Sequence, residues 1–250
     1  MLLAVDIGNT NIGLAVFDGE EIVKKIKTPA DTNLTHEDYQ RIFTDAINGY
    51  EITEAVMGSV LAELTLPVKN ALEDMVLKVF EVTSDTYCGF AMASDKSVKK
   101  GADILATNCA AYNLYGDCIV VDAGTATTLQ IMDKGVFIGC VIAPGMLMGA
   151  RALHEFTSLL PLIELKKPQK CWGMNTVECM EAGIFYGHAA MIEGMISRIE
   201  EEAGHSFKTI GTGGTIPELI SIMKRPLDIV DYDLIYKGLK IIYDLNSKKS

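Results

Sequence analysis

The sequence predicts an α/β protein of two lobes that is built around a duplicated unit. The first observation is a repeat: residues 2–23, LLAVDIGNTNIGLAVFDGEEIV, align with residues 118–139, CIVVDAGTATTLQIMDKGVFIG, after a shift of 116 positions. The second is the alternation of strand and helix patterns between and after the two copies. The third is composition, because 49% apolar residues and a mean hydropathy of +0.22 are ample for a folded core.

Each copy of the repeat reads as three strands joined by two turns. The alignment matches Asp6 with Asp122, Gly8 with Gly124 and Gly19 with Gly135. A tight glycine turn follows the first strand, and a two-residue turn, Asp18-Gly19 or Lys134-Gly135, follows the second. One D-x-G pair is common by chance. A matched pair inside matched strand and turn patterns indicates a duplicated fold.

The segment between the copies predicts three helices and two strands. THEDYQRIFTDAINGY is an amphipathic helix with Thr35 as its N-cap and with Glu37 and Asp38 in its first turn. The other predicted elements are a buried strand over 54–59, a helix over 67–79, a strand over 80–84, and a helix over 101–116 that ends at a C-cap glycine.

The segment after the second copy predicts three further helices. The first is a long helical region over 173–204, and the last is a closing helix over 233–246. Between them, residues 207–223 predict a strand, a glycine loop and the remaining helix. The Met-rich stretch APGMLMGA reads as core or interface packing. We expect the lobes to cover residues 1–100 and 101–250, with a cleft between them.

Charge and cysteine usage exclude several classes of protein. The net charge of −11 argues against nonspecific binding to nucleic acid. The longest uncharged run, Gly135 to Ala150, is short for a membrane span and contains a proline. The six cysteines form no C-x-x-C pair, and Cys109, Cys118 and Cys140 read as buried thiols. We expect a reduced, cytoplasmic protein with no membrane or nucleic-acid partner.

The two D-x-G turns suit a nucleoside triphosphate. A glycine turn lets backbone N–H groups approach phosphate oxygens, and nearby side chains offer further donors, namely Asn9, Thr10, Thr125, Thr127 and Thr128. Asp6 and Asp122 would repel phosphate directly, so each requires a cation in between, either Mg²⁺ or a monovalent ion. The alternative is that each aspartate only caps its turn.

Two further features fit phosphoryl transfer. The loop TIGTGGTIPEL carries Gly211, Gly213 and Gly214 between a strand and a helix, and it could hold part of a nucleotide or be a plain helix-entry turn. Asp103 stands at a helix start, where an aspartate is most often a dipole-stabilising cap. It is also a candidate general base, because a kinase needs a group that takes the proton of the accepting hydroxyl. His188 reads as a structural histidine.

Taken together, these residues resemble the type III pantothenate kinase family, within the acetate and sugar kinase/Hsp70/actin superfamily. The resemblance runs nearly from end to end and is carried by the motifs DIGNTNIG at 6–13, GAD at 101–103, DAGTATT at 122–128, IAPG at 142–145, TSLLP at 157–161, NT at 175–176, TGG at 212–214 and GLKIIY at 238–243. It implies a duplicated ribonuclease H-like (actin-like ATPase) fold: two lobes, each with a mixed sheet of the five-stranded type flanked by helices, and a nucleotide cleft between them.

The resemblance also implies a role for each matching residue. ATP would be bound by Asp6, Gly8, Asn9, Thr10, Asn11, Gly13, Thr125, Gly213 and Gly214. Asp6 would help position Mg²⁺, and Asp122 would bind a monovalent cation such as K⁺ or NH₄⁺. Asp103 would be the general base. Pantothenate would contact Gly101, Ala102, Asp103, Ile104 and Thr176. Family members are homodimers with the acceptor site near the subunit interface.

Two departures from the family pattern affect the acceptor side. The family has an arginine where this chain has Ile104, and a tyrosine upstream where this chain has AMASDKSVKK. Losing such an arginine costs on the order of 2–4 kcal/mol at a desolvated carboxylate site. The leading expectation is an ATP-dependent pantothenate kinase of coenzyme A synthesis. The alternatives are a kinase with a related, less anionic alcohol as acceptor, and a non-catalytic regulator that binds nucleotide or metabolite.

Overall fold

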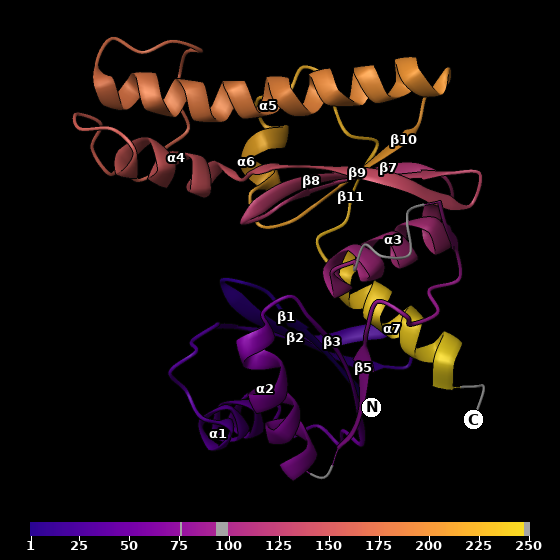
Figure 1. Ribbon diagram of the computed structural model, residues 1–250. Helices are drawn as coiled ribbons and strands as arrows, with labels where there is room; N and C mark the ends of the chain where they lie inside the picture. Colours follow the sequence, from indigo (N-terminus) through magenta and orange to yellow (C-terminus); the bar gives the residue numbers. More distant parts are fainter. Residues whose placement is uncertain (76, 94–99, 248–250) are drawn as a thin grey trace. The chain divides into compact units, whose positions relative to one another are not determined.

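The computed structural model describes residues 1–75, 77–93 and 100–247, and the chain forms two compact units (Figure 1). The first unit holds Met1–Leu114 together with Asp233–Ser250, and the second holds Tyr115–Tyr232. The boundaries between the units thus lie after Leu114 and after Tyr232, whereas the sequence suggested a single boundary after residue 100. The last helix and the helix that follows residue 101 pack on the first sheet, so they belong to the first unit.

The first unit is built on a mixed sheet of five strands in the order β3-β2-β1-β4-β5. Antiparallel pairing joins β1 (Leu2–Ile7), β2 (Asn11–Asp18) and β3 (Glu21–Pro29). Parallel pairing joins β1 to β4 (Glu54–Ser59) and β4 to β5 (Lys78–Val82). A two-residue strand, β6 (Ala91–Met92), follows in the chain.

Helices pack on both faces of this sheet. Leu3, Val5 and Ile7 of β1 belong to the core cluster with α1 (His36–Ala46) and α2 (Ala62–Asp74). Leu2 and Ala4 belong to the cluster with α3 (Ala102–Tyr115) and α7 (Leu234–Ser247). Because side chains alternate along a strand, Asp6 projects toward the face that α3 and α7 cover.

The second unit repeats this plan. Its five strands lie in the order β11-β10-β7-β8-β9, and β8 (Ala126–Asp133) is antiparallel to both β7 (Cys118–Ala123) and β9 (Val136–Pro144). The strands β10 (Lys208–Thr212) and β11 (Ile229–Val230) extend the order in parallel. The helices α4 (Met146–Glu155), α5 (Thr176–Ala203) and α6 (Ile216–Ile220) supply apolar residues to one core with β7.

The predicted duplication is confirmed, with a one-residue correction after the first turn. Strands β1 and β7 begin 116 residues apart, at 2 and 118, whereas β2 and β8 begin 115 apart, at 11 and 126. The first turn holds residues 8–10 and the second only 124–125. Gly19 therefore matches Lys134, not Gly135, and both have positive φ, 59° and 51°. The first two-residue turn is Gly19-Glu20, because Asp18 is the last residue of β2 and pairs with Glu21 of β3.

Most predicted elements are confirmed, and three details were wrong. Helix α2 begins at Ala62, so Pro67 lies inside it, and it ends before the predicted residue 79 because β5 begins at Lys78. The Met-rich stretch packs in the core as predicted, because Met146 and Ala150 of α4 belong to the core cluster of the second unit. Cys140 is exposed, whereas Cys109 and Cys118 are buried as predicted. In the described parts of the chain, no helix is both long and apolar enough to cross a membrane.

Candidate active site

Asp6 lies between two glycines at the end of β1. Its Cα partners are Gly13 on β2 and Gly58 on β4, so all three positions face the same side of the sheet. A Cβ on Gly58 would lie 3.0 Å from the Cβ of Ala102, the first residue of α3. The start of α3 therefore packs on Gly58, the strand neighbour of Asp6, near the carboxyl ends of β1 and β4.

The turn after Asp6 is closed by backbone hydrogen bonds. The Gly8 amide donates to the Asn11 carbonyl over 3.0 Å, and the Thr10 carbonyl accepts from the Ala30 amide over 3.0 Å. Asn9 and Thr10 are exposed at the tip, while Gly13 is buried in β2. The turn thus has a fixed shape with polar side chains at the surface, which suits an anionic ligand.

Asp103 is the second residue of α3, and its carboxylate curls back over the helix start. Its Oδ1 accepts from the Ile104 amide over 2.7 Å, and a Cβ on Gly101 would overlap that same oxygen. Burial raises the pKa of Asp103, and hydrogen bonds from the backbone amides of Ile104 and of Asp103 itself act in the opposite direction. A partly desolvated carboxylate is a stronger base than one in water, as a proton acceptor requires.

In the second unit, the glycine loop after β10 wraps around Asp122. Gly213 has φ of 97°, and a Cβ there would lie 2.5 Å from both Asp122 Oδ1 and the Ala123 carbonyl. The amide and hydroxyl of Thr215 donate to the Ala123 carbonyl over 3.0 and 2.9 Å. The structure thus brings together two predicted site residues, Asp122 and Gly213. A Cβ on Gly214 would meet nothing within 4 Å.

Thr125 lies in the β7–β8 turn beside the start of α4. The Gly145 amide donates to the Thr125 carbonyl over 3.1 Å, and a Cβ on Gly145 would overlap the carbonyls of Gly124 and Thr125. Gly145 ends the IAPG motif, so the close approach of α4 to the turn explains the glycine in that motif. The turn also adjoins Asp122, since a Cβ on Gly124, the residue before Thr125, would lie 3.8 Å from Asp122 Oδ1.

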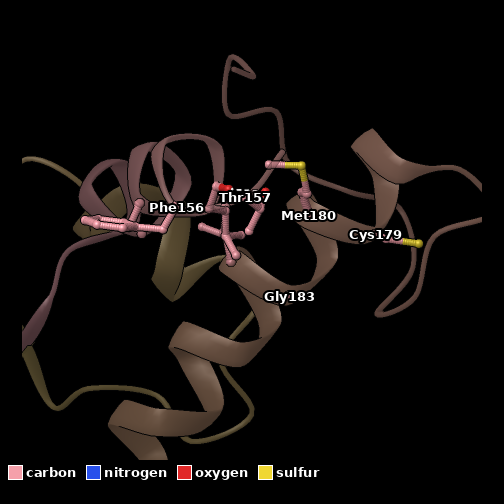
Figure 2. Close-up of a pocket in the computed structure, with 9 residues that line it drawn as sticks. Phe156, Thr157, Cys179, Met180 and Gly183 are labelled. Atoms are coloured by element: carbon pink, nitrogen blue, oxygen red, sulfur yellow. Dashed lines mark hydrogen bonds between the residues drawn. The ribbon is translucent and has the colours of Figure 1, made fainter. Parts of the chain in front are cut away.

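Thr176 stands apart, as the first residue of α5. Its neighbour Asn175 caps the helix by accepting from the Glu178 amide over 3.0 Å, and Thr176 itself is exposed. An apolar groove of about 480 Å³ lies between the end of α4 and the first turns of α5, and Figure 2 shows the side chains that line it. Those labelled there are Phe156, Thr157, Cys179, Met180 and Gly183.

His188 has a polar partner, as expected of a structural histidine. Its Nε2 lies 2.8 Å from the hydroxyl of Thr127, and burial lowers its pKa, which favours the neutral ring. Sequence reasoning missed Gly58, Gly145 and Tyr236, which set the geometry around the predicted residues. Gly145 stands in a motif that could have indicated it, whereas nothing near Tyr236 points to the turn it approaches.

The donor set of the first unit fits Mg²⁺ held mainly by phosphate oxygens. Among the described residues, no group of three or more His, Cys, Asp and Glu side chains could hold a metal by itself. Mg²⁺ in phosphate-transfer sites needs only one or two carboxylates besides the phosphates and waters. Asp6 provides one such carboxylate at the mouth of a glycine-containing turn. The first unit thus offers one carboxylate that could hold a metal, Asp6, and one that could accept a proton, Asp103, and the second unit offers Asp122 with its loop.

Solved structures similar to this chain share its fold. A protein described as a Baf family transcriptional activator from Campylobacter jejuni aligns over 98% of this chain and 99% of its own, with a TM-score of 0.63 and 20% identity. MreB 5 of Spiroplasma citri bound to AMPPNP aligns over 99% and 97%, with a TM-score of 0.54 and 12% identity. The predicted actin-like ATPase fold is confirmed.

Sequence relatives extend the comparison beyond the fold. Residues 2–198 match the family model described as type III pantothenate kinase. The type III pantothenate kinase of Halalkalibacterium halodurans is 35% identical, covering 98% of this chain and all of its own. That of Syntrophobacter fumaroxidans is 36% identical, covering 99% of each. The chain belongs to the type III pantothenate kinase family.

Proposed function

We propose that this protein transfers the γ-phosphoryl group of ATP to pantothenate, giving 4′-phosphopantothenate in the first step of coenzyme A synthesis. The observation that carries the proposal is the placement of two aspartates in the first unit on either side of Gly58. Gly58 is the Cα partner of Asp6, and a Cβ on Gly58 would lie 3.0 Å from Ala102, the residue before Asp103. End-to-end sequence similarity to two type III pantothenate kinases supports the same reaction. We place the reaction in the cytoplasm.

In the proposed mechanism, Asp103 removes the proton from the primary hydroxyl of pantothenate. The hydroxyl oxygen forms a bond to the γ-phosphorus, the bond from that phosphorus to the bridging oxygen breaks, and ADP leaves. The β1–β2 turn and the start of β2, from Gly8 to Gly13 with Asn9, Thr10 and Asn11, would hold the phosphates through backbone amides and polar side chains. Mg²⁺ neutralises phosphate charge when bound, and Asp6 is the residue that would hold it.

The second unit supplies the remaining proposed contacts. Asp122 would hold a monovalent cation, K⁺ or NH₄⁺, while Thr125, Gly213 and Gly214 would contact ATP. The tight packing of the Gly213 loop on Asp122 supports a shared role for these residues. Thr176 is a further proposed contact to the acceptor. In the first unit, the proposed acceptor contacts are Gly101, Ala102 and Ile104.

Ile104 raises the question of which alcohol is the acceptor. Its side chain supplies no charge where the resemblance led us to expect an arginine. The upstream segment without a tyrosine lies partly in 94–99, outside the described residues. A coupled assay with ATP, Mg²⁺ and K⁺ should show turnover with pantothenate. Faster turnover with a less anionic alcohol would favour the alternative acceptor, and nucleotide binding without any transfer would favour a regulator.

We also propose that the protein is a homodimer that uses the α4–α5 face. Phe156 lines the apolar groove and is 85% exposed, and Leu159 and Met174, in the segment between α4 and α5, are 90% and 86% exposed. Exposed apolar surface of this kind marks association surfaces. Sedimentation should give twice the chain mass. Changing Phe156 to Glu should shift it to the monomer, whereas Leu66→Glu, at an exposed leucine of α2, should not. A monomeric wild type would contradict this proposal.

A further inference from the structure

The hydroxyl of Tyr236 approaches the candidate metal ligand from α7. Tyr236 lies in the first turn of that helix, and its Oη occupies the space where Gly13 would carry a Cβ. Gly13 is the Cα partner of Asp6, so the hydroxyl lies over the residue next to the aspartate, on the face toward which Asp6 projects. Any larger residue at position 13 would displace the tyrosine.

The same face is closed on the other side of Asp6. At Gly58 a Cβ would meet Ala102 of α3 at 3.0 Å and Leu239 of α7 at 3.2 Å. Gly238 packs directly on the Ala106 backbone, so α3 and α7 are in close contact. Asp6 thus projects between Tyr236 on one flank and the start of α3 on the other, and its orientation is limited by both.

We infer that Tyr236 is a positioning residue, whose hydroxyl holds the Asp6 side chain and the β1–β2 turn in the geometry that receives the metal–nucleotide. The inference rests on the proposed function. A tyrosine hydroxyl is a proton donor at neutral pH, and a hydrogen bond from it to a carboxylate is a strong, charge-assisted one. The carboxylates of Asp6 and Asp233 both act electrostatically on this hydroxyl.

The competing explanation is packing alone, because the Tyr236 ring also contacts the core cluster of α3 and α7. Tyr236→Phe separates the two, since it keeps the ring and removes only the hydroxyl. Losing a hydrogen bond to a charged group predicts about a tenfold weaker affinity for Mg²⁺–ADP by calorimetry. The KM for ATP should rise by a similar factor, with the KM for pantothenate unchanged. Tyr243→Phe, on the same helix but bonded to Glu54, is the matched control and should leave nucleotide affinity unchanged.

A second pair of variants tests the geometry without any ligand. Gly13→Ala should lower the Tm because the new methyl overlaps the hydroxyl. Adding Tyr236→Phe to it should restore most of the loss, because the nearest ring atom would then lie 3.1 Å from the methyl. The inference would be overturned if the double variant were no more stable than Gly13→Ala. It would also be overturned if Tyr236→Phe bound Mg²⁺–ADP with wild-type affinity, and in both cases the proposed function would still stand. A wild type that binds no Mg²⁺–nucleotide would overturn the proposed function as well.

Discussion

At the scale of single residues, Asp103 carries opposite consequences for activity and for stability. Burial raises its pKa, so the folded state binds the proton more tightly than the unfolded state does. Its contribution to stability is therefore present at low pH and lost as pH rises through the raised pKa. Asp103→Asn should lower kcat at least about 100-fold and yet raise the Tm at neutral pH. In the wild type, kcat/KM should rise with pH as the carboxyl ionises.

The control for this prediction is Glu63→Gln, because Glu63 is the second residue of α2 as Asp103 is of α3. Glu63 is exposed, so its removal should cost only a few tenths of a kcal/mol of helix-dipole energy and leave kcat unchanged. Thermal melts at several pH values and initial rates decide the outcome. If Asp103→Asn stays active and loses stability as Glu63→Gln does, Asp103 is a helix cap and not the base.

The glycine loop offers a second test at residue scale. Gly213→Ala forces a side chain into a backbone with φ of 97° and against Asp122 Oδ1, so it should cost about 1–3 kcal/mol of unfolding free energy. It should also raise the K⁺ concentration needed for half-maximal activity. Gly214→Ala, one residue later in open space, should change the unfolding free energy by less than about 0.5 kcal/mol. If urea titrations gave the same loss of unfolding free energy for both variants, the Gly213 loop would not be packed specifically against Asp122.

The residues that could be predicted are those whose role lies in their own side chain and turn. Asp6, Asp103 and Asp122 follow strand or helix patterns that can be read locally, and Gly213 stands in an evident loop. Gly58 and Tyr236 could not be found, because each matters only through a neighbour distant in sequence. In the folded chain, Gly58 packs against the methyl of Ala102, and the hydroxyl of Tyr236 packs against Gly13.

At the scale of elements, α5 depends on how it ends. Gly204 adopts φ of 75° and donates its amide to the Glu200 carbonyl over 2.9 Å, which closes the helix. Gly204→Ala should cost about 1–2 kcal/mol, because L-residues avoid this conformation. Gly194→Ala, in the helix interior with nothing within 4 Å, should instead stabilise the protein by about 0.5–1 kcal/mol. Chemical denaturation of both variants measures the difference, and a loss at Gly194 as large as at Gly204 would contradict it.

Element boundaries were predictable where a cap or a glycine marks them. Thr35 forms a capping box with Asp38 at the start of α1, and Gly116, at φ of 79°, follows the end of α3. The predicted start of α2 at Pro67 was wrong. A proline is favoured at a helix start, but here the helix begins five residues earlier and buries Leu64 and Val68 on either side of the proline. The D-x-G pattern revealed the repeat but not the length of each turn. The predicted alignment of the two copies was therefore wrong by one residue after the first turn.

At the scale of the whole molecule, the sequence could not reveal which sheet receives the last helix. Strand and helix order alone suggested a boundary at residue 100. In the structure, Leu239 and Ile242 of α7 are buried in the cluster with Leu2 and Ala4 of β1, so the first unit is assembled from both ends of the chain. The second unit is continuous, and its two ends are joined where the Tyr115 hydroxyl donates to Asp231 Oδ2 over 2.9 Å.

This division predicts that the two units differ in their capacity to fold alone. A fragment of residues 115–232 should show a cooperative unfolding transition by circular dichroism, because its core cluster lies within it. A fragment of residues 1–114 should show none. Without α7 it leaves part of the β1 face uncovered, and burying two large side chains contributes about 3–6 kcal/mol, which is comparable to the stability of a whole domain. Joining residues 233–247 to that fragment through a Gly/Ser linker should restore the transition. Equal transitions with and without the added helix would show that α7 does not complete the first unit.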